Sequence, residues 1–243
     1  MRAYRAKREQ KLQKAVVTGA SSGIGKAITH RLLAMGYSVV GISRTVTCEI
    51  FPHQNFRALQ VDLSQPCKTQ DLCNILQKED THILINAAGF GRFKPHEEQS
   101  LKIIEQMTHL NLTAPMLLTH ATLRSLKKSG GYLININSIE ALRASKFAAL
   151  YSATKAGLKA FGDALFEETR KSELSITNIN PDMTESNFYD ELRFSVSEEE
   201  NEKLLASDIA DAVEHILTMR KGAVVSEYTI RSLQFGIKKK SKS

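Results

Sequence analysis

The sequence predicts one α/β domain in which a doubly wound parallel sheet of about seven strands is covered by helices on both faces. Short apolar runs rich in β-branched residues alternate along the chain with longer segments of helical periodicity. Such alternation is typical of strand–helix–strand units, whose strands are parallel. The 243 residues suffice for one large core, and no linker-like segment divides them. The predicted domain spans residues 14–231, between a basic N-terminal arm (1–13) and a basic C-terminal tail (232–243).

Seven segments are predicted as strands because each is a short apolar run bounded by glycine or polar residues. In chain order they are 15–17, 38–43, 56–61, 82–85, 132–137, 174–179 and 224–230. Gly130 and Gly131 form the turn into the fifth strand. The stretch 182–206 is polar and charged, so we expect it to be an excursion from the sheet.

The predicted helices are longer segments with apolar residues three or four positions apart. In chain order they cover 24–35, 67–78, a segment from about 97, a segment through 111 to 128, 148–172 and 207–219. Gly36 ends the first helix, because glycine accepts the left-handed conformation found at helix ends. Pro115 is expected to bend the fourth helix, and Ser207 is expected to cap the last one.

Charge and cysteine usage narrow the class of protein. The net charge is +7, but residues 1–14 carry six basic side chains and one acidic one, and 238–243 carry four lysines. The chain between them is therefore slightly acidic, and a nucleic-acid-binding surface on the fold is not expected. No apolar run is long enough for a membrane span, and the N-terminus does not have the pattern of a secretory signal. The cysteines lack metal-ligand spacing, which predicts free thiols, no bound metal and a cytoplasmic protein.

Four polar residues and a glycine-rich turn carry the functional information. Tyr151 and Lys155 are four residues apart on a predicted helix, with Ser138 thirteen residues and Asn111 forty residues before the tyrosine. The turn TGASSGIG (18–25) lies between the first strand and the first helix. In this order and context, they resemble the short-chain dehydrogenase/reductase family over most of the chain. The resemblance implies a Rossmann-type fold and hydride transfer between a nicotinamide cofactor and a carbonyl or alcohol.

The glycine turn predicts the pyrophosphate site. Its spacing, Gly19-x-x-x-Gly23-x-Gly25, matches the variant of the dinucleotide fingerprint that this family uses. Gly19 permits a tight turn, whereas Gly23 and Gly25 remove side chains where the pyrophosphate and the neighbouring strand approach. The N-terminus of the following helix offers N–H groups and a positive dipole end to the phosphates. The residues expected to line the same turn are Ser21, Ser22 and Ile24.

The end of the second strand predicts the choice between NADP(H) and NAD(H). The strand ends at Ser43 and Arg44, and the next acidic residue is Glu49. An NAD site places an acid about 20 residues past the glycines, where it would repel a 2′-phosphate. A guanidinium and a hydroxyl instead bind a 2′-phosphate. This looks like the family's NADP-preferring pattern, and the alternative is that Arg44 is an ordinary solvated arginine.

The resemblance assigns further cofactor contacts to the ends of later strands. Asp62 and Leu63 resemble the family's adenine contact, and the alternative is that Asp62 caps a helix near Ser64. Residues 86–89 resemble the family's Asn-Asn-Ala-Gly, with Ala87 in place of the second asparagine. The expected contacts there are Asn86, Ala87 and Gly89.

The segment after the sixth strand departs from the family pattern. Pro181 and Ser186 match positions that border the nicotinamide carboxamide, and Thr184 competes with Ser186 for that role. Asp182 stands where the family has glycine. We expect it to constrain the backbone and to bring a carboxylate close to the nicotinamide.

Each member of the Asn111, Ser138, Tyr151 and Lys155 tetrad has an expected role. The pKa of a phenol, near 10, is too high for a base at neutral pH, so the Lys155 ammonium one turn away is expected to stabilise the phenolate. Ser138 is expected to bind the substrate oxygen. The resemblance implies that Asn111 bends its helix and holds a water in a proton relay, and that Lys155 also holds the nicotinamide ribose. Each residue has an ordinary structural alternative, but four coincidences at the family's separations are not expected.

Three segments are expected to border the substrate and two helices to form a subunit interface. The candidate substrate residues are Phe90, Arg92, Phe93, Glu140, Arg143, Tyr189, Leu192 and Arg193. The arginines either receive an acidic substrate or are surface charges, while the phenylalanines and Tyr189 suit an apolar lid. Apolar surface around Leu117 and around Phe161 predicts a homodimer or a homotetramer with twofold symmetry, unless all of it faces the subunit's own sheet.

The sequence therefore predicts an NADP(H)-dependent oxidoreductase that acts on a small-molecule carbonyl or secondary alcohol, with Tyr151 as general acid/base. Two alternatives stay open at this point. One is a non-catalytic, NADP(H)-binding regulatory member of the same fold, which Asp182 keeps open. The other is a binder of RNA or of an anionic surface, for which only the basic tails speak.

Overall fold

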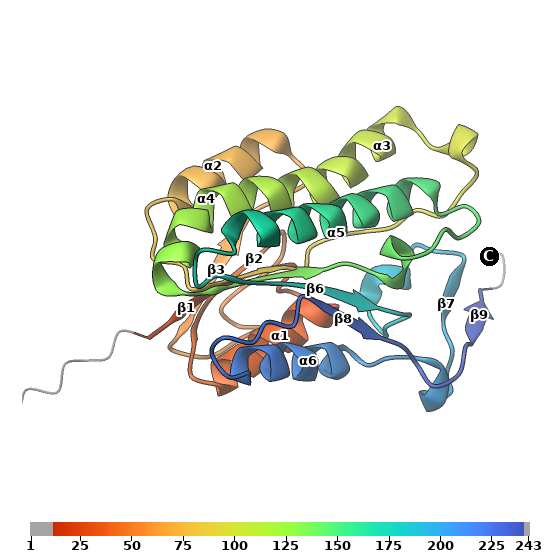
Figure 1. Cartoon of the computed structure of the whole chain (residues 1–243). Coiled ribbons are helices and arrows are strands. Elements are labelled where there is room, and N and C mark those ends of the chain that lie inside the picture. Colours follow the sequence, from red (N-terminus) through yellow and green to blue (C-terminus); the bar gives the residue numbers. More distant parts are fainter. Residues whose placement is uncertain (1–11, 241–243) are drawn as a thin grey trace, which may run out of the picture.

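The computed structural model describes residues 12–240, in which helices pack on both faces of a central sheet (Figure 1). Within this range, seven strands pair in parallel in the order β3-β2-β1-β4-β5-β6-β8. They are β1 (Lys14–Thr18), β2 (Ser38–Ser43), β3 (Phe56–Gln60), β4 (Ile83–Asn86), β5 (Tyr132–Ile136), β6 (Ser175–Pro181) and β8 (Glu227–Ile230). The predicted doubly wound sheet is confirmed. Its strand order reverses between β1 and β4, where sheets of this kind bind ligands at the carboxyl ends of the strands.

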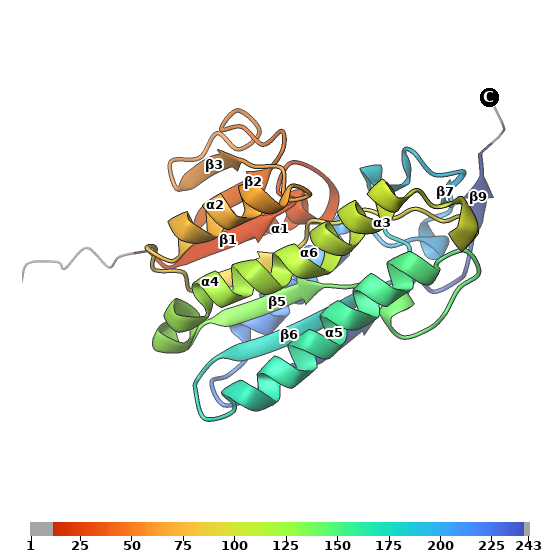
Figure 2. The same cartoon turned by 90° about the horizontal axis from the view of Figure 1, so that it is seen from above.

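The helices divide between the two faces of the sheet (Figures 1 and 2). α1 (Gly23–Ala34) and α6 (Ala206–Thr218) pack together on one face. α2 (Pro66–Leu76), α4 (Ala114–Ser129) and α5 (Ala149–Thr169) cover the other face. α3 (Leu101–Thr108) runs into α4 through a π-helical segment, η2 (His109–Thr113). The short 3-10 helices are η1 (His96–Glu98), η3 (Ile139–Ala141), η4 (Asn187–Tyr189) and η5 (Glu200–Glu202).

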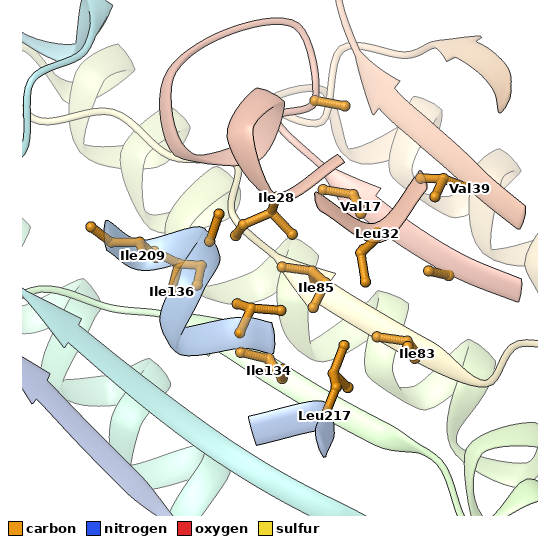
Figure 3. Packing of buried hydrophobic residues seen from close by; sticks show 14 of the residues in the cluster. Val17, Ile28, Leu32, Val39, Ile83, Ile85, Ile134, Ile136, Ile209 and Leu217 are labelled. Carbon is orange, nitrogen blue, oxygen red and sulfur yellow. The ribbon is translucent and has the colours of Figure 1, made fainter. Parts of the chain in front are cut away.

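Each face of the sheet has its own apolar core. Val17 and Ile85 point to the cluster that includes Ile28 and Leu32 of α1 (Figure 3). The residues next to them in their strands, Val16 and Leu84, belong to the cluster under α2, α4 and α5. Side chains alternate between faces along a strand, so a sheet covered on both sides needs apolar residues at successive positions. This is why the strands are recognisable as continuous apolar runs.

Two further strands form a separate antiparallel sheet, which the sequence did not predict. β7 (Phe194–Val196) lies in the expected excursion, and β9 (Ile237–Lys239) lies in the expected C-terminal tail. The Lys240 N–H donates to the carbonyl of Arg193 (2.9 Å), and Lys238 pairs with Glu198. Two of the lysines that indicated a solvated tail, Lys238 and Lys240, therefore help to hold this segment beside β7. Residues 1–11 and 241–243, which include most of the N-terminal arm, lie outside the described residues.

Two local predictions about helices need correction. α6 is capped at Leu205, whose N–H donates to Oδ2 of Asp208 (2.8 Å), and Ser207 lies inside the first turn. Pro115 is the second residue of α4, and the turn before it is π-helical. Proline has no N–H to donate into that turn, so the change that the structure has at this point is in the hydrogen-bond pattern of the helix. None of the helices between residues 12 and 240 has the length and apolar character needed to cross a membrane.

Candidate active site

The structure brings the four tetrad residues together beside the carboxyl end of β5. Lys155 Nζ donates to the carbonyl of Ile136, the last residue of β5 (2.8 Å). The hydroxyl of Ser138, two residues further on, hydrogen-bonds the phenol of Tyr151. Asn111 Nδ2 donates to Thr154 Oγ1 (3.2 Å), in the turn of α5 that carries the tyrosine and the lysine. The predicted grouping of Asn111, Ser138, Tyr151 and Lys155 is therefore what the fold assembles.

Asn111 is fully buried in the π-helical segment. Its side-chain amide pairs with the backbone of Phe90, since Nδ2 donates to the Phe90 carbonyl (2.9 Å) and Oδ1 accepts from the Phe90 N–H (3.1 Å). A Cβ atom on Gly89 would lie 3.1 Å from Asn111 Oδ1 and 3.5 Å from Lys155 Nζ. Asn111 thus fixes the loop after β4 against α5, and its role in a water relay stays a prediction.

Burial controls the ionisation of the tyrosine and the lysine. Tyr151 is 6% exposed and Lys155 is 5% exposed. Burial raises the pKa of Tyr151 above its ordinary value, against the smaller opposing effect of the hydrogen bond from Ser138. Burial lowers the pKa of Lys155 to about 8. The ammonium bonds the Ile136 carbonyl and lies 5.9 Å from the centroid of the tyrosine ring, and its expected stabilisation of the phenolate stays a prediction.

A cluster that we call the aromatic lid covers Tyr151. The ring centroids of Phe93 and Phe188 lie 5.4 and 5.7 Å from that of Tyr151. Behind them, Phe194 of β7 lies 5.3 Å from Phe93 and 5.9 Å from Tyr189. The lid consists of Phe93, Phe188, Tyr189 and Phe194. Of these, Phe93 and Tyr189 were predicted, and the other two were missed although they are aromatic residues in an otherwise polar stretch.

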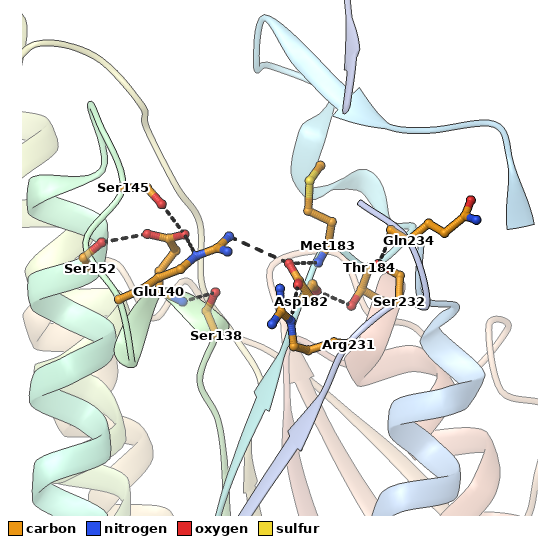
Figure 4. Close-up of polar contacts among 11 residues, drawn as sticks. Ser138, Glu140, Ser145, Ser152, Asp182, Met183, Thr184, Arg231, Ser232 and Gln234 are labelled. Atoms are coloured by element: carbon orange, nitrogen blue, oxygen red, sulfur yellow. Dashed lines mark hydrogen bonds and ion pairs between the residues drawn. The ribbon is translucent and has the colours of Figure 1, made fainter. Parts of the chain in front are cut away.

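Four charged residues form a second cluster near Ser138, which we call the ionic rim (Figure 4). Glu140 accepts from Arg143 Nε (3.0 Å), and Asp182 accepts from Arg231 Nε (3.2 Å). Arg143 joins the two pairs, with Nη2 3.9 Å from Asp182 Oδ1. Glu140 also accepts from the hydroxyls of two serines, Ser145 (2.7 Å) and Ser152 (3.1 Å). The sequence pointed to Glu140, Arg143 and Asp182, and it missed Arg231, which the fold brings in from the end of β8.

Asp182 sits in this rim without the backbone constraint that we expected. Phe147 is the one non-glycine residue with a positive φ in the described range, so Asp182 needs no left-handed conformation. Its carboxylate also accepts from the N–H of Met183 (3.0 Å). The charge that replaces the family's glycine is therefore neutralised and hydrogen-bonded within the rim.

The glycine turn fits a dinucleotide pyrophosphate. Gly19 and Gly23 have φ values of 70° and 50°, which residues other than glycine rarely adopt. A Cβ atom on Gly25 would lie 2.3 Å from the carbonyl oxygen of Gly19. α1 begins at once after Ser22 with no side-chain cap and no acidic residue in its first turn. Its first N–H groups are consequently available to an anion. Ser21 and Ile24, expected to line the turn, flank this helix start.

The structure separates the two candidates for the segment after β6. Thr184 is buried, and its hydroxyl donates to the carbonyl of Asp182 (2.9 Å). Ser186 instead lies against the glycine turn, because a Cβ atom on Gly23 would be 2.9 Å from Ser186 Cβ. Pro181, the last residue of β6, is buried. Ser186 is thus the better placed of the two hydroxyls for a ligand on the turn.

The predicted adenosine end is more open. Arg44 is exposed, and its charge acts on Asp62. Burial acts to raise the pKa of Asp62, but hydrogen bonds from Ser64 and Gln65, together with Arg44, leave that pKa below its ordinary value. The carboxylate of Asp62 accepts from the N–H (3.0 Å) and the hydroxyl (2.7 Å) of Ser64, so the local turn that was the alternative interpretation is present. Ser43 Oγ similarly accepts from the N–H of Val46 (2.9 Å).

The loop after β4 is tied to β1. The N–H groups of Ala87 and Ala88 both donate to Thr18 Oγ1 (3.0 Å each). Asn86, expected at the cofactor, uses its side-chain Nδ2 to bond Asn135 on β5 (3.0 Å). Leu63 is buried in the core under α2. The described residues include no cluster of three or more His, Cys, Asp or Glu side chains placed to hold a metal ion.

The fold and the site together have the features of a nucleotide-binding oxidoreductase. A comparison with known protein families supports this class, since the family described as short chain dehydrogenase matches residues 13–196 of the sequence. The chain belongs to the short-chain dehydrogenase/reductase family, as its motifs predicted.

Relatives in sequence and in structure cover most of the chain. An uncharacterised oxidoreductase of Staphylococcus epidermidis is 32% identical over 224 residues, which are 89% of this chain and 96% of that protein. The alcohol dehydrogenase of the archaeon Thermococcus sibiricus, solved with 5-hydroxy-NADP, superposes with a TM-score of 0.82 at 25% identity and covers 92% of this chain and 98% of that one. A short-chain dehydrogenase from Sphingobium yanoikuyae, solved with NADPH, gives a TM-score of 0.79 at 25% identity over 89% and 87% of the chains.

Proposed function

We propose that the protein is an NADP(H)-dependent oxidoreductase that interconverts a small-molecule carbonyl compound and its alcohol, with Tyr151 as general acid/base. The observation that carries the proposal is the hydrogen-bonded pair of Ser138 and Tyr151 next to the buried ammonium of Lys155. When bound, the nicotinamide cofactor supplies or accepts a hydride at the carbonyl carbon. The work left to the protein is to bind the oxygen of the substrate and to move one proton to or from it.

The hydrogen bonds of Ser138 suit it to orient that oxygen. Ser138 Oγ accepts from the N–H of Glu140 (3.2 Å), so its own hydrogen is left to donate to Tyr151 or to a substrate. The raised pKa of Tyr151 keeps the phenol protonated at neutral pH, which suits proton donation during carbonyl reduction. The Lys155 ammonium, charged below about pH 8, favours the phenolate that remains after the transfer.

Several residues support NADP(H) as the cofactor. The glycine turn and the uncapped start of α1 suit the pyrophosphate, and Ser186 lies against that turn. The exposed guanidinium of Arg44 next to Ser43 suits a 2′-phosphate. Asp62, Leu63 and the loop 86–89 complete the proposed site, with Pro181 at its inner end. Two of the relatives above were solved with an NADP derivative and with NADPH.

We also propose that the protein self-associates through α4 and α5 and that it is cytoplasmic. α5 presents four exposed alanines, Ala153, Ala156, Ala160 and Ala164, on one side, which suits close approach of a second helix. Phe161 packs in part against the subunit's own core, so the small residues are the better candidates for contact. The three cysteines are free thiols, which suits a reducing compartment.

The two alternatives gain little support. Asp182, which kept the regulatory alternative open, is satisfied by Arg231 and Met183. RNA binding through the C-terminal tail is weakened as an alternative because two of the tail lysines have partners within the protein. Lys238 pairs with Glu198, and Lys240 donates to the backbone carbonyls of Tyr189 and Asp190.

The test is NADPH oxidation with a panel of aldehydes and ketones, followed at the NADPH absorbance band. We expect Tyr151→Phe to lower turnover by about 100-fold or more, because it removes the proton donor and keeps the ring. NADPH binding should survive in this variant. Tyr37→Phe is the matched control, since Tyr37 lies at the opposite end of the sheet, before β2. Turnover by Tyr151→Phe near the unmodified rate would refute the proposed role.

A further inference from the structure

The surroundings of the Tyr151 hydroxyl have one apolar side, the aromatic lid. Phe93 and Phe188 come from different segments, and both contact the tyrosine ring. Gly91 makes room for them, since a Cβ atom there would lie 2.6 Å from Phe188 Cζ and 2.8 Å from Phe93 Cε2. Rings at these separations favour offset and edge-to-face contacts with a further flat group. A substrate that reaches the phenol must therefore place its substituent against these two rings.

The other side is the ionic rim, which combines two carboxylates and two guanidinium groups and has no net charge (Figure 4). The rim lies close to Tyr151, since Glu140 accepts from Ser152 in the same helix and its charge contributes to raising the pKa of Tyr151. The Asp182 side chain is only 3% exposed, and it faces both arginines. Arg143 and Arg231 are 40% and 60% exposed, but each is already paired with a carboxylate, so an anionic substrate gains less from them than from unpaired guanidinium groups.

Cations further out on the lid are also engaged. Arg92, next to Phe93, pairs with Glu191. Lys240 donates to the carbonyls of Tyr189 and Asp190. Two of the three arginines that suggested an acidic substrate in the sequence, Arg92 and Arg143, are thus paired with the protein's own acids.

The geometry points to an uncharged carbonyl compound with a flat apolar substituent as the substrate of this site, and to Asp182 as the residue that sets selectivity against carboxylate-bearing substrates. This inference rests on the proposed function and adds the substrate class to it. The carbonyl oxygen meets Ser138 and Tyr151, and the substituent lies against Phe93 and Phe188. Asp182 acts by keeping Arg143 and Arg231 neutralised.

The test compares methyl 4-formylbenzoate with 4-formylbenzoate, which share a ring and an aldehyde and differ in charge. We expect kcat/KM with NADPH to favour the ester by about tenfold or more. Asp182→Asn should shrink this ratio, because it releases positive charge at the rim. Glu214→Gln is the matched control, since it removes a carboxylate from the ion pair with Arg31 on the far face of the sheet. It should leave the ratio unchanged.

The outcomes separate the inference from the proposed function. Turnover with equal or greater preference for the carboxylate would overturn the inference and leave the oxidoreductase function standing. A folded Asp182→Asn variant with an unchanged ratio would overturn the inference in the same way. If Asp182→Asn does not fold, the ratio in the unmodified protein decides. If neither aldehyde is reduced, the proposed function fails for this class of substrate. The inference is then tested by the thermal shift of the NADP⁺-loaded protein, measured with methyl 4-(hydroxymethyl)benzoate and with 4-(hydroxymethyl)benzoate. A larger shift with the ester supports the inference, and any other result overturns it.

Discussion

Lys155→Met is predicted to make the folded protein more stable near neutral pH and to make this advantage disappear in alkali. Burial lowers the pKa of Lys155 from 10.5 to about 8, so the folded protein carries a buried charge whenever the pH is below about 8. The unfolded chain binds more protons than the folded chain between about pH 8 and 10.5, so the stability of the unmodified protein rises with pH across that window. Methionine keeps the apolar stem and cannot titrate.

The magnitude follows from the two pKa values. Integrated between pH 7 and pH 10, the lowering of the Lys155 pKa from 10.5 to about 8 corresponds to about 2–3 kcal/mol of unfolding free energy. Lys155→Met also loses the hydrogen bond to Ile136. This loss changes the stability difference between the two proteins by the same amount at pH 7 and at pH 10, so it does not affect the pH-dependent part. Urea unfolding of both proteins at pH 7 and pH 10 measures it, and groups that titrate in both proteins cancel. A stability difference that stays constant between the two pH values would refute the reasoning, and NADPH binding should meanwhile be weakened in Lys155→Met.

Three further predictions concern cofactor choice, assembly and the lid. Arg44→Asp should weaken NADPH binding by about 1.5–3 kcal/mol while sparing NADH, and equal affinity of the unmodified protein for both cofactors in a titration would contradict this. Ala160→Glu should dissociate the proposed oligomer, because it buries an unpaired charge; a monomeric mass for the unmodified protein by light scattering at micromolar concentration would argue against any such interface. Deletion of residues 233–243 removes β9 and should expose Tyr151. The pKa of Tyr151 should then fall, and the alkaline limb of the pH–rate profile should move to lower pH. An alkaline limb at the same pH as in the unmodified protein would show that β9 does not hold the aromatic lid in place.

The sheet was predictable because burial on both faces leaves a strong signal in the sequence. β2 is found with the predicted bounds, since its apolar residues are flanked by Gly36 and by polar residues. Gly36 has a φ of 87°, as expected for a helix-ending glycine. β9 was missed because its three residues, IKK, are exposed and owe their strand conformation to pairing with β7. Such pairing between distant segments has no local signature.

In the candidate site, too, the features with a local sequence signal were predicted, and those formed by distant segments were missed. The tetrad was recognisable because Tyr151 and Lys155 are one turn apart on one helix, while Ser138 and Asn111 precede them at the separations that this family shows. The ionic rim was not, since Arg231 and Asp182 are far apart in sequence and meet only because β6 and β8 are neighbours in the sheet. The raised pKa of Tyr151 was not predicted, because a sequence shows which charged residues are near a group and does not show how completely other side chains exclude water from it.

The small β7–β9 sheet is a unit that could be exchanged between relatives of this protein. Its strands pair with each other and not with the seven-stranded sheet. We expect substitutions in these strands to reshape the aromatic lid over Tyr151, through Phe194 and its ring contacts, and to leave the seven-stranded sheet that positions the tetrad unchanged. Chimeras that exchange the segments 188–198 and 232–240 between relatives are therefore a direct way to transplant substrate preference, since both halves of the pairing travel together and the core keeps its own sequence.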